Sequence, residues 1–213
     1  HYVERKPHAM RESVGRIIET LRSVRKQKKI FLFLIAFFFF IDGVYTIIDM
    51  ATAYGSALGL DSTGLLLALL VTQFVAFPFS ILFGRLAEKY DTGKLILTCI
   101  AAYMGITVFA VFMKAQWQFW VLAIFVGMFQ GGIQALSRSY FAKIVPPERS
   151  GEYFGLMDIC GKGASFMGTT VVGLASQAFG SINIGVSAIV FLFLAGALFF
   201  MKTEHSGSES TKN

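Results

Sequence analysis

Six apolar stretches, each long enough to cross a lipid bilayer, follow one another along this chain and restrict its fold more than any other feature. An α-helix rises about 1.5 Å per residue, so about 20 apolar residues span the hydrocarbon core. A membrane β-barrel would instead show alternation over segments of about ten residues. We therefore predict an all-α integral membrane protein with six transmembrane helices. The predicted spans are residues 30–57, 62–83, 95–113, 117–137, 153–178 and 182–201.

The basic residues predict which side of the membrane each connection faces. Of the 19 Lys and Arg, 17 lie in residues 1–29, 84–94, 138–150 or after residue 201. Cytoplasmic connections are enriched in Lys and Arg, so we expect a multi-pass protein with both termini in the cytoplasm, in a bacterial-type cell membrane. The net charge of +6 is then a topology signal that can also attract anionic lipid. We expect no nucleic-acid partner.

The chain divides into three predicted parts. Apolar residues recur at helical spacing over residues 9–27 with arginines between them, which predicts an amphipathic helix on the cytoplasmic surface. A simple basic tether is the alternative. Residues 1–29 therefore form a cytoplasmic amphipathic linker, and their internal character suggests part of a longer protein. Residues 30–201 form the six-helix transmembrane domain, and the polar residues 202–213 form a disordered cytoplasmic tail.

Ionisable and amide side chains inside the predicted spans are the candidate functional residues, because an unpaired charge in the bilayer is costly. Asp158 and Lys162 are four residues apart with the acid first, the favourable order for an ion pair on one helix face. They could line a polar cavity or only lock the helix in place, and the two glutamines could be hydrogen-bonding contacts between helices. The candidates for substrate binding or proton coupling are Asp42, Tyr45, Asp49, Gln130, Gln134, Asp158 and Lys162.

The two cysteines and the glycines of the spans have a packing interpretation. Cys99 and Cys160 both fall in predicted spans and are expected to be buried apolar residues, with no disulfide between them. Gly127 and Gly131 lie four residues apart in the fourth span, a pattern that lets a neighbouring helix approach closely.

Catalytic chemistry has no visible basis in the spans. The three histidines, His1, His8 and His205, all lie near the termini, and the chain has neither an HExxH motif nor a CxxC motif. The Gly-x-x-x-x-Gly-Lys-Ser/Thr phosphate-binding loop is absent as well. We therefore expect no enzyme activity, no catalytic residue, no metal and no cofactor.

Two connections resemble a known superfamily. The sequence GRLAEKYDTGK at residues 84–94 resembles the signature loop of the major facilitator superfamily, and PPERSGEYFG at residues 146–155 resembles its P-E-x-R-G-x-x-x-G element. QGGIQALSRS at 130–139 and DICGK at 158–162 are similar to the vacuole-effluxer-like branch, which is related to the fungal autophagy-linked amino-acid effluxers. The resemblance implies a cytoplasmic gating element at Gly84, Arg85, Glu88, Lys89, Gly93, Lys94, Glu148 and Arg149.

The resemblance also implies an architecture and a function. In this superfamily each half is a three-plus-three inverted repeat, with the solute bound between the halves near the midplane. These six spans would be the C-terminal half of a twelve-span secondary transporter that moves a small polar solute, such as an amino acid for efflux, by alternating access. Its partners would be the lipid bilayer, the solute, and an N-terminal six-helix half or a second copy of the chain. The alternative is a non-transporting membrane scaffold or a half-size protein that acts as a homodimer.

Overall fold

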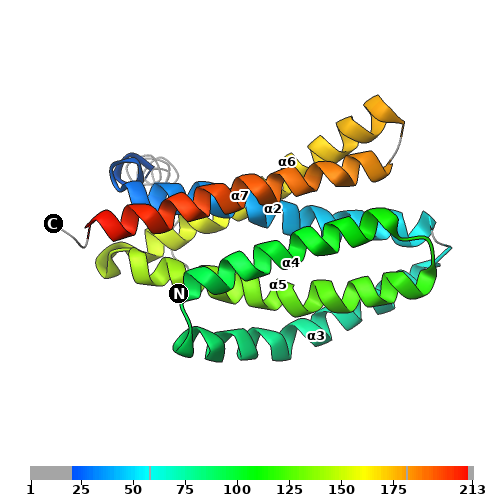
Figure 1. Cartoon of the computed structure of the whole chain (residues 1–213), viewed down its shortest axis with the longest axis horizontal. Coiled ribbons are helices and arrows are strands. Elements are labelled where there is room, and N and C mark those ends of the chain that lie inside the picture. The colour runs from blue at the N-terminus through cyan, green and yellow to red at the C-terminus, as the bar shows by residue number, and fades with distance from the viewer. Residues whose placement is uncertain (1–20, 58, 181, 211–213) are drawn as a thin grey trace, which may run out of the picture.

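The computed structural model describes residues 21–57, 59–180 and 182–210, and this part of the chain is built from helices joined by short turns. Figure 1 shows the long helices running roughly side by side. Residues 21–26 are also helical and precede the first labelled helix. The elements are α2 (Lys28–Ala57), α3 (Ser62–Lys89), α4 (Thr92–Phe112), α5 (Gln116–Ile144), the 3₁₀ turn η1 (Pro147–Arg149), α6 (Ser150–Phe179) and α7 (Ile182–Ser210).

Five of these helices contain segments that are long and apolar enough to cross a membrane. They are Lys28–Ala51, Ser62–Lys89, Thr92–Phe112, Gln116–Ile144 and Ser187–His205. The sixth predicted span lies within α6, which has 30 residues but is less apolar than these five segments and is not counted with them. Its sequence mixes six glycines with Asp158 and Lys162, which lowers the hydropathy without shortening the helix. The all-helical class is confirmed, and the sixth crossing stays a prediction.

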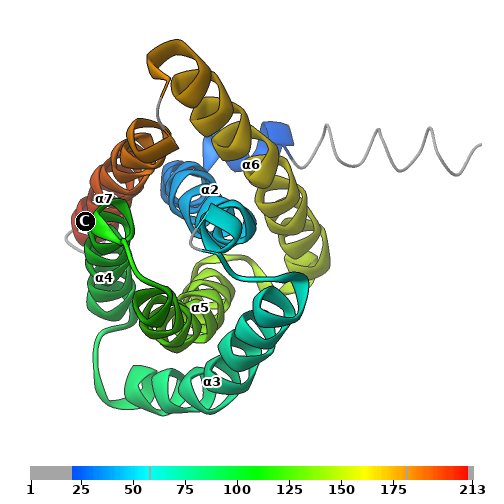
Figure 2. The same cartoon turned by 90° about the vertical axis from the view of Figure 1, so that its right-hand side faces the viewer.

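Two helices, α2 and α5, form the centre of the packing. α2 packs against α6 and α7, α5 packs against α3 and α4, and α4 packs against α7. Figure 2, viewed along the bundle, shows α4 and α7 on one side of this central pair and α3 and α6 on the other. The polar residues predicted on α2, α5 and α6 therefore belong to helices that meet around one region.

An aromatic cluster joins three of these helices. The ring of Phe33 in α2 stacks on Tyr140 and Phe141 of α5, with centroids 5.2 and 5.3 Å away, and meets the edge of Phe200 in α7 at 6.1 Å. Each such pair contributes about 0.5–1.5 kcal/mol beyond simple burial. The cluster fixes α2, α5 and α7 at the end of the bundle where the α3–α4 and α5–α6 connections lie. We call this the cation-rich end.

The predicted close approach at the glycines of α5 is confirmed. A Cβ atom built on Gly127 would lie 2.6 Å from the carbonyl oxygen of Thr72 in α3, and one on Gly131 would overlap the carbonyl oxygen of Ala76. The Thr72 hydroxyl also donates a hydrogen bond to the carbonyl oxygen of Ala123 in α5, at 3.3 Å. Backbone-to-backbone contact of this kind is possible only where α5 lacks side chains.

The connections at the cation-rich end are shorter than predicted. The expected loop 84–94 is helical as far as Lys89, and α4 begins at Thr92, so only Tyr90 and Asp91 join the two helices. Asp91 is the N-cap of α4, because its carboxylate accepts a hydrogen bond from the backbone N–H of Lys94 at 3.0 Å. A carboxylate cap satisfies a free amide and lets the helix start immediately after the turn. The connection expected at 138–150 is likewise helical up to Ile144.

The two ends of the chain were also predicted from the sequence. The prediction of a disordered tail from residue 202 is wrong as far as residue 210, because α7 continues to Ser210. The Glu204 carboxylate accepts a hydrogen bond from the hydroxyl of Tyr140, which holds the extra turns of α7 against α5. Residues 211–213 lie outside the described part. Most of the predicted amphipathic helix, residues 9–20, also lies outside it.

Candidate functional site

A pocket of about 140 Å³ lies where α2, α5 and α6 meet. It contains four of the seven predicted residues, namely Tyr45, Gln134, Asp158 and Lys162. A fifth polar residue, Arg138, was not among them. The lining residues are Phe37, Ile41, Tyr45, Gln134, Arg138, Met157, Asp158, Gly161 and Lys162. We call this the central pocket.

The ion pair in the central pocket is not the predicted one. Asp158 pairs with Arg138 of α5, with 2.8 Å between carboxylate and guanidinium, rather than with Lys162 one turn along its own helix. The side chains of Arg138 and Asp158 are 58% and 50% exposed. The guanidinium reaches across from α5 and occupies the carboxylate, so Lys162 has no ion pair within the described residues. The pocket therefore carries one uncompensated positive charge.

Arg138 could have been found from the sequence. Gln130, Gln134 and Arg138 follow one another at four-residue steps, which places them along one face of α5. The neighbouring Ser137 is fully buried, and its hydroxyl donates to the carbonyl oxygen of Ile133, one turn earlier on the same helix, at 2.6 Å.

Asp42 lies near the middle of α2 but does not line the central pocket, contrary to the prediction. Its side chain is fully buried against α6, where Oδ1 accepts a hydrogen bond from the backbone N–H of Gly168 at 2.8 Å. The Thr46 hydroxyl donates to the same oxygen at 3.5 Å. The other oxygen, Oδ2, is buried without a hydrogen-bond partner in the described structure. Asp42 is therefore part of the contact between two helices.

The two remaining predicted residues are also outside the central pocket. Asp49 is exposed, and its Oδ2 accepts a hydrogen bond from the Ser165 hydroxyl of α6 at 3.2 Å. The side-chain oxygen of Gln130 is buried, with no hydrogen-bond partner in the described structure. Hydropathy places these residues within predicted spans, but it does not fix the rotation of each helix about its axis.

The predicted gating residues lie together at the cation-rich end. Gly84, Arg85, Glu88 and Lys89 are exposed on the last turns of α3. Gly93 in the first turn of α4 lies against α7, because a Cβ atom there would be 2.9 Å from Oε2 of Glu204. Lys143 of α5 donates to the Thr92 hydroxyl at 2.9 Å. Lys94 also lies in the first turn of α4, and its backbone N–H donates the capping hydrogen bond to Asp91.

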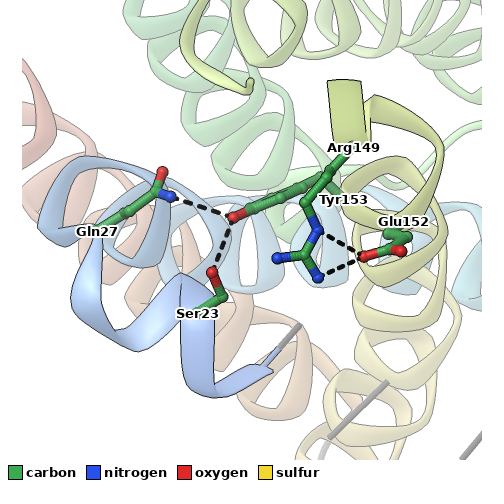
Figure 3. Close-up of polar contacts among 5 residues, drawn as sticks. All are labelled: Ser23, Gln27, Arg149, Glu152 and Tyr153. Carbon is green, nitrogen blue, oxygen red and sulfur yellow. Dashed lines mark hydrogen bonds and ion pairs between the residues drawn. The ribbon is translucent and has the colours of Figure 1, made fainter. Parts of the chain in front are cut away.

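A second set of contacts surrounds the start of α6 (Figure 3). The hydroxyl of Tyr153 accepts a hydrogen bond from the Gln27 side chain at 3.2 Å and shares one with the Ser23 hydroxyl at 3.4 Å. Arg149 forms two hydrogen bonds with the Glu152 carboxylate, at 2.7 and 3.0 Å, on the adjoining turn. The neighbouring Glu148 is exposed. The two contacts of Tyr153 attach the segment before α2 to α6.

Taken together, these observations describe an all-α, multi-pass membrane protein with a charged pocket between three of its helices. A family model described as "Vacuole effluxer Atg22 like" matches residues 3–211, and the chain belongs to this family.

Individual relatives agree with this assignment. The chain is 45% identical over 196 residues to a Bacillus subtilis protein named "Uncharacterized MFS-type transporter YxiO", covering 92% of this chain and 46% of the relative. It is 27% identical over 201 residues to autophagy-related protein 22-2 of Aspergillus clavatus, covering 86% of this chain and 32% of the relative. Autophagy-related protein 22 of Cryptococcus neoformans is 26% identical over 198 residues, with 85% and 35% covered. The chain thus spans less than half the length of these relatives.

Proposed function

We propose that this chain is the C-terminal half of a secondary active transporter that moves a small polar solute by alternating access. The observation that carries the proposal is the exposed, charged lining of the central pocket. Arg138, Asp158 and Lys162 are all exposed on helices of membrane-spanning length. Charges at such positions are costly against lipid, so this face requires water or another protein surface. A second six-helix half would supply both.

The packing of the helices supports a three-plus-three inverted repeat. If α2, α3 and α4 correspond to α5, α6 and α7, the contact of α2 with α6 corresponds to that of α5 with α3. The contact of α2 with α7 then corresponds to that of α5 with α4, and α4 with α7 corresponds to itself. All of these contacts are present, whereas the contact of α6 with α7 has no comparable counterpart between α3 and α4 in the described structure. In transporters built this way, the solute binds at the interface of the repeats near the midplane.

The charges suggest the chemistry of the solute. Lys162 offers up to three hydrogen-bond donors and no acceptor, and it suits a carboxylate. Asp158 is held by Arg138 through an exposed ion pair, and exposed pairs are weak, at about 0–1 kcal/mol. A solute ammonium could therefore compete with Arg138 for Asp158. We propose amino acids as the first solutes to test.

Asp42 has a separate proposed role, which is to couple transport of the solute to the binding of a proton. Oδ1 accepts the hydrogen bond from the N–H of Gly168, while Oδ2 has no partner among the described residues, so a proton can bind to Oδ2 without displacing that hydrogen bond. Protonation there would change the charge buried between α2 and α6, which both contribute to the central pocket. We further propose that Arg85 and Glu88 contact the other half at the cytoplasmic side, where both termini would also lie.

The proposal is tested by reconstituting two proteins in liposomes, namely this chain alone and the complete reading frame that contains it. Uptake of a mixture of ¹⁴C-labelled amino acids is measured in both. We expect uptake with the complete protein only, because the chain alone provides one wall of the path. Uptake by the chain alone would establish a homodimer and refute the two-half arrangement. Absence of uptake from both would refute amino-acid transport.

A further inference from the structure

A larger pocket, of about 540 Å³, lies at the cation-rich end on the other side of α6 from the central pocket. Leu156 and Cys160 line it; Leu156 is two residues from Asp158 and Cys160 is two residues from Lys162, which is roughly 200° around the helix in each case. The lining residues are Leu21, Val24, Arg25, Phe31, Leu34, Ile35, Phe38, Phe39, Leu156 and Cys160. All except Arg25 are apolar, and α2 and α6 supply most of them. We call this the outer pocket.

The helical segment at residues 21–26 covers one end of the outer pocket and is held in place. Ser23 and Gln27 both hydrogen-bond to the hydroxyl of Tyr153 in α6, as Figure 3 shows. Val24 is 2% exposed and belongs to the hydrophobic core. The pocket is therefore bounded by packed elements on its α2, α6 and N-terminal sides.

Positive charge surrounds this covered end. Arg25 lines the pocket itself, and Arg22, Lys26 and Lys28 are exposed on the same short stretch. No acidic residue occurs in residues 21–30. None of these four cations forms an ion pair within the described ranges. The charge is thus available to an anion at the mouth of an apolar pocket.

We propose that the outer pocket binds an anionic glycerophospholipid, with an acyl chain between α2 and α6 and the headgroup phosphate beside Arg25. An apolar pocket beside a membrane-spanning helix is filled by the hydrocarbon of the surrounding bilayer. Basic residues at the surface of such a helix select anionic headgroups from that bilayer. This site is independent of the central pocket and of the solute proposed for it.

The test uses the purified chain in nanodiscs of phosphatidylcholine with phosphatidylglycerol, and native mass spectrometry counts the lipids that stay bound. We expect retained phosphatidylglycerol in the wild type and its loss in Ile35→Trp, which fills the pocket from a half-buried position. Arg25→Gln should lower the preference for phosphatidylglycerol about fivefold, the factor that corresponds to about 1 kcal/mol per basic residue near an anionic surface. The matched controls are Leu67→Trp, on the exposed face of α3, and Lys114→Gln, between α4 and α5. Equal retention in Ile35→Trp and wild type, or an unchanged preference in Arg25→Gln, would overturn the proposal.

The native thiol of Cys160 provides a second readout that does not depend on the stability of a variant. Cys160 lines the outer pocket, whereas Cys99 is fully buried and should not react in the folded protein. Phosphatidylglycerol should slow labelling of Cys160 by N-ethylmaleimide relative to phosphatidylcholine alone. A photoreactive maleimide on Cys160 should crosslink to lipid. Crosslinks to residues 1–20 instead would show that this chain's own N-terminal segment fills the pocket, and would overturn the proposal.

Discussion

Replacing Gly168 with alanine should separate α2 from α6 at the buried carboxylate of Asp42. A Cβ atom at Gly168 would overlap the Thr46 hydroxyl and Asp42 Oδ1, and would lie 3.0 Å from Asp42 Cγ. None of these atoms can move far, because Asp42 and Thr46 are both fully buried. Overpacking of this kind costs about 1–3 kcal/mol.

The same substitution should weaken the hydrogen bond between the helices. The N–H of Gly168 donates to Asp42 at 2.8 Å, and hydrogen bonds to charged groups contribute about 1.5–3 kcal/mol. If the helices separate enough to relieve the overlap, much of that contribution is lost. We expect a total destabilisation of about 3 kcal/mol, which in a chain of this size lowers Tm by roughly 6–12 °C.

Thermal unfolding in detergent measures this effect through the buried thiol of Cys99, in a Cys160→Ser background. A maleimide dye that fluoresces on reaction reports unfolding when Cys99 becomes accessible. Gly163→Ala is the matched control, because it is on the same helix and its Cβ would meet nothing within 4 Å. Alanine is the better helix former by about 1 kcal/mol, so this control should be neutral or stabilising.

A second substitution identifies the cause. Thr46→Ala removes the hydroxyl nearest the new Cβ, so it should recover part of the loss when combined with Gly168→Ala. Equal Tm values for Gly168→Ala and Gly163→Ala would show that the contact at Gly168 is not overpacked by a Cβ atom. So would a double variant whose loss is the simple sum of the two single losses.

Three further substitutions test other contacts. Asp91→Ala removes the N-cap of α4 and should lower the free energy of unfolding by about 1 kcal/mol in the same thermal assay; no change would mean that the cap does not stabilise the helix. Tyr140→Phe removes the donor to Glu204 and should cost about 1.5–3 kcal/mol, and proteolysis should then release the end of α7 sooner than in wild type. Asp42→Asn keeps an acceptor for the N–H of α6 but cannot titrate, so amino-acid uptake by the complete protein should lose its pH dependence; an unchanged pH profile would exclude this residue from coupling.

Hydropathy was sufficient to predict the helices, but not their ends. The apolar runs marked every long helix in order, because the hydrocarbon thickness sets a length that a sequence displays directly. The ends depend on individual polar atoms. Asp91 caps α4 after a two-residue turn, and Tyr140 holds Glu204 in a region that composition alone suggested to be disordered.

Only part of the polar site could be predicted, and the reason is related. Tyr45, Gln134, Asp158 and Lys162 share a pocket as expected, since their helices meet at the centre of the bundle. The spacing of Asp158 and Lys162 favoured a pair within one helix, yet the guanidinium on α5 takes the carboxylate. Local spacing cannot reveal such a competitor, because it depends on which face each helix turns toward its neighbours.

We propose that the central pocket between α2, α5 and α6 binds the transported solute. The most direct test compares uptake of labelled amino acids by the complete protein carrying Lys162→Met with the same protein carrying Lys114→Met. Lys162 lines the pocket without an ion pair in the described structure, whereas Lys114 is exposed in the connection between α4 and α5. We expect Lys162→Met to raise KM or abolish uptake, and Lys114→Met to match wild type. Equal uptake by the two variants, at equal protein levels, would contradict the assignment of this pocket.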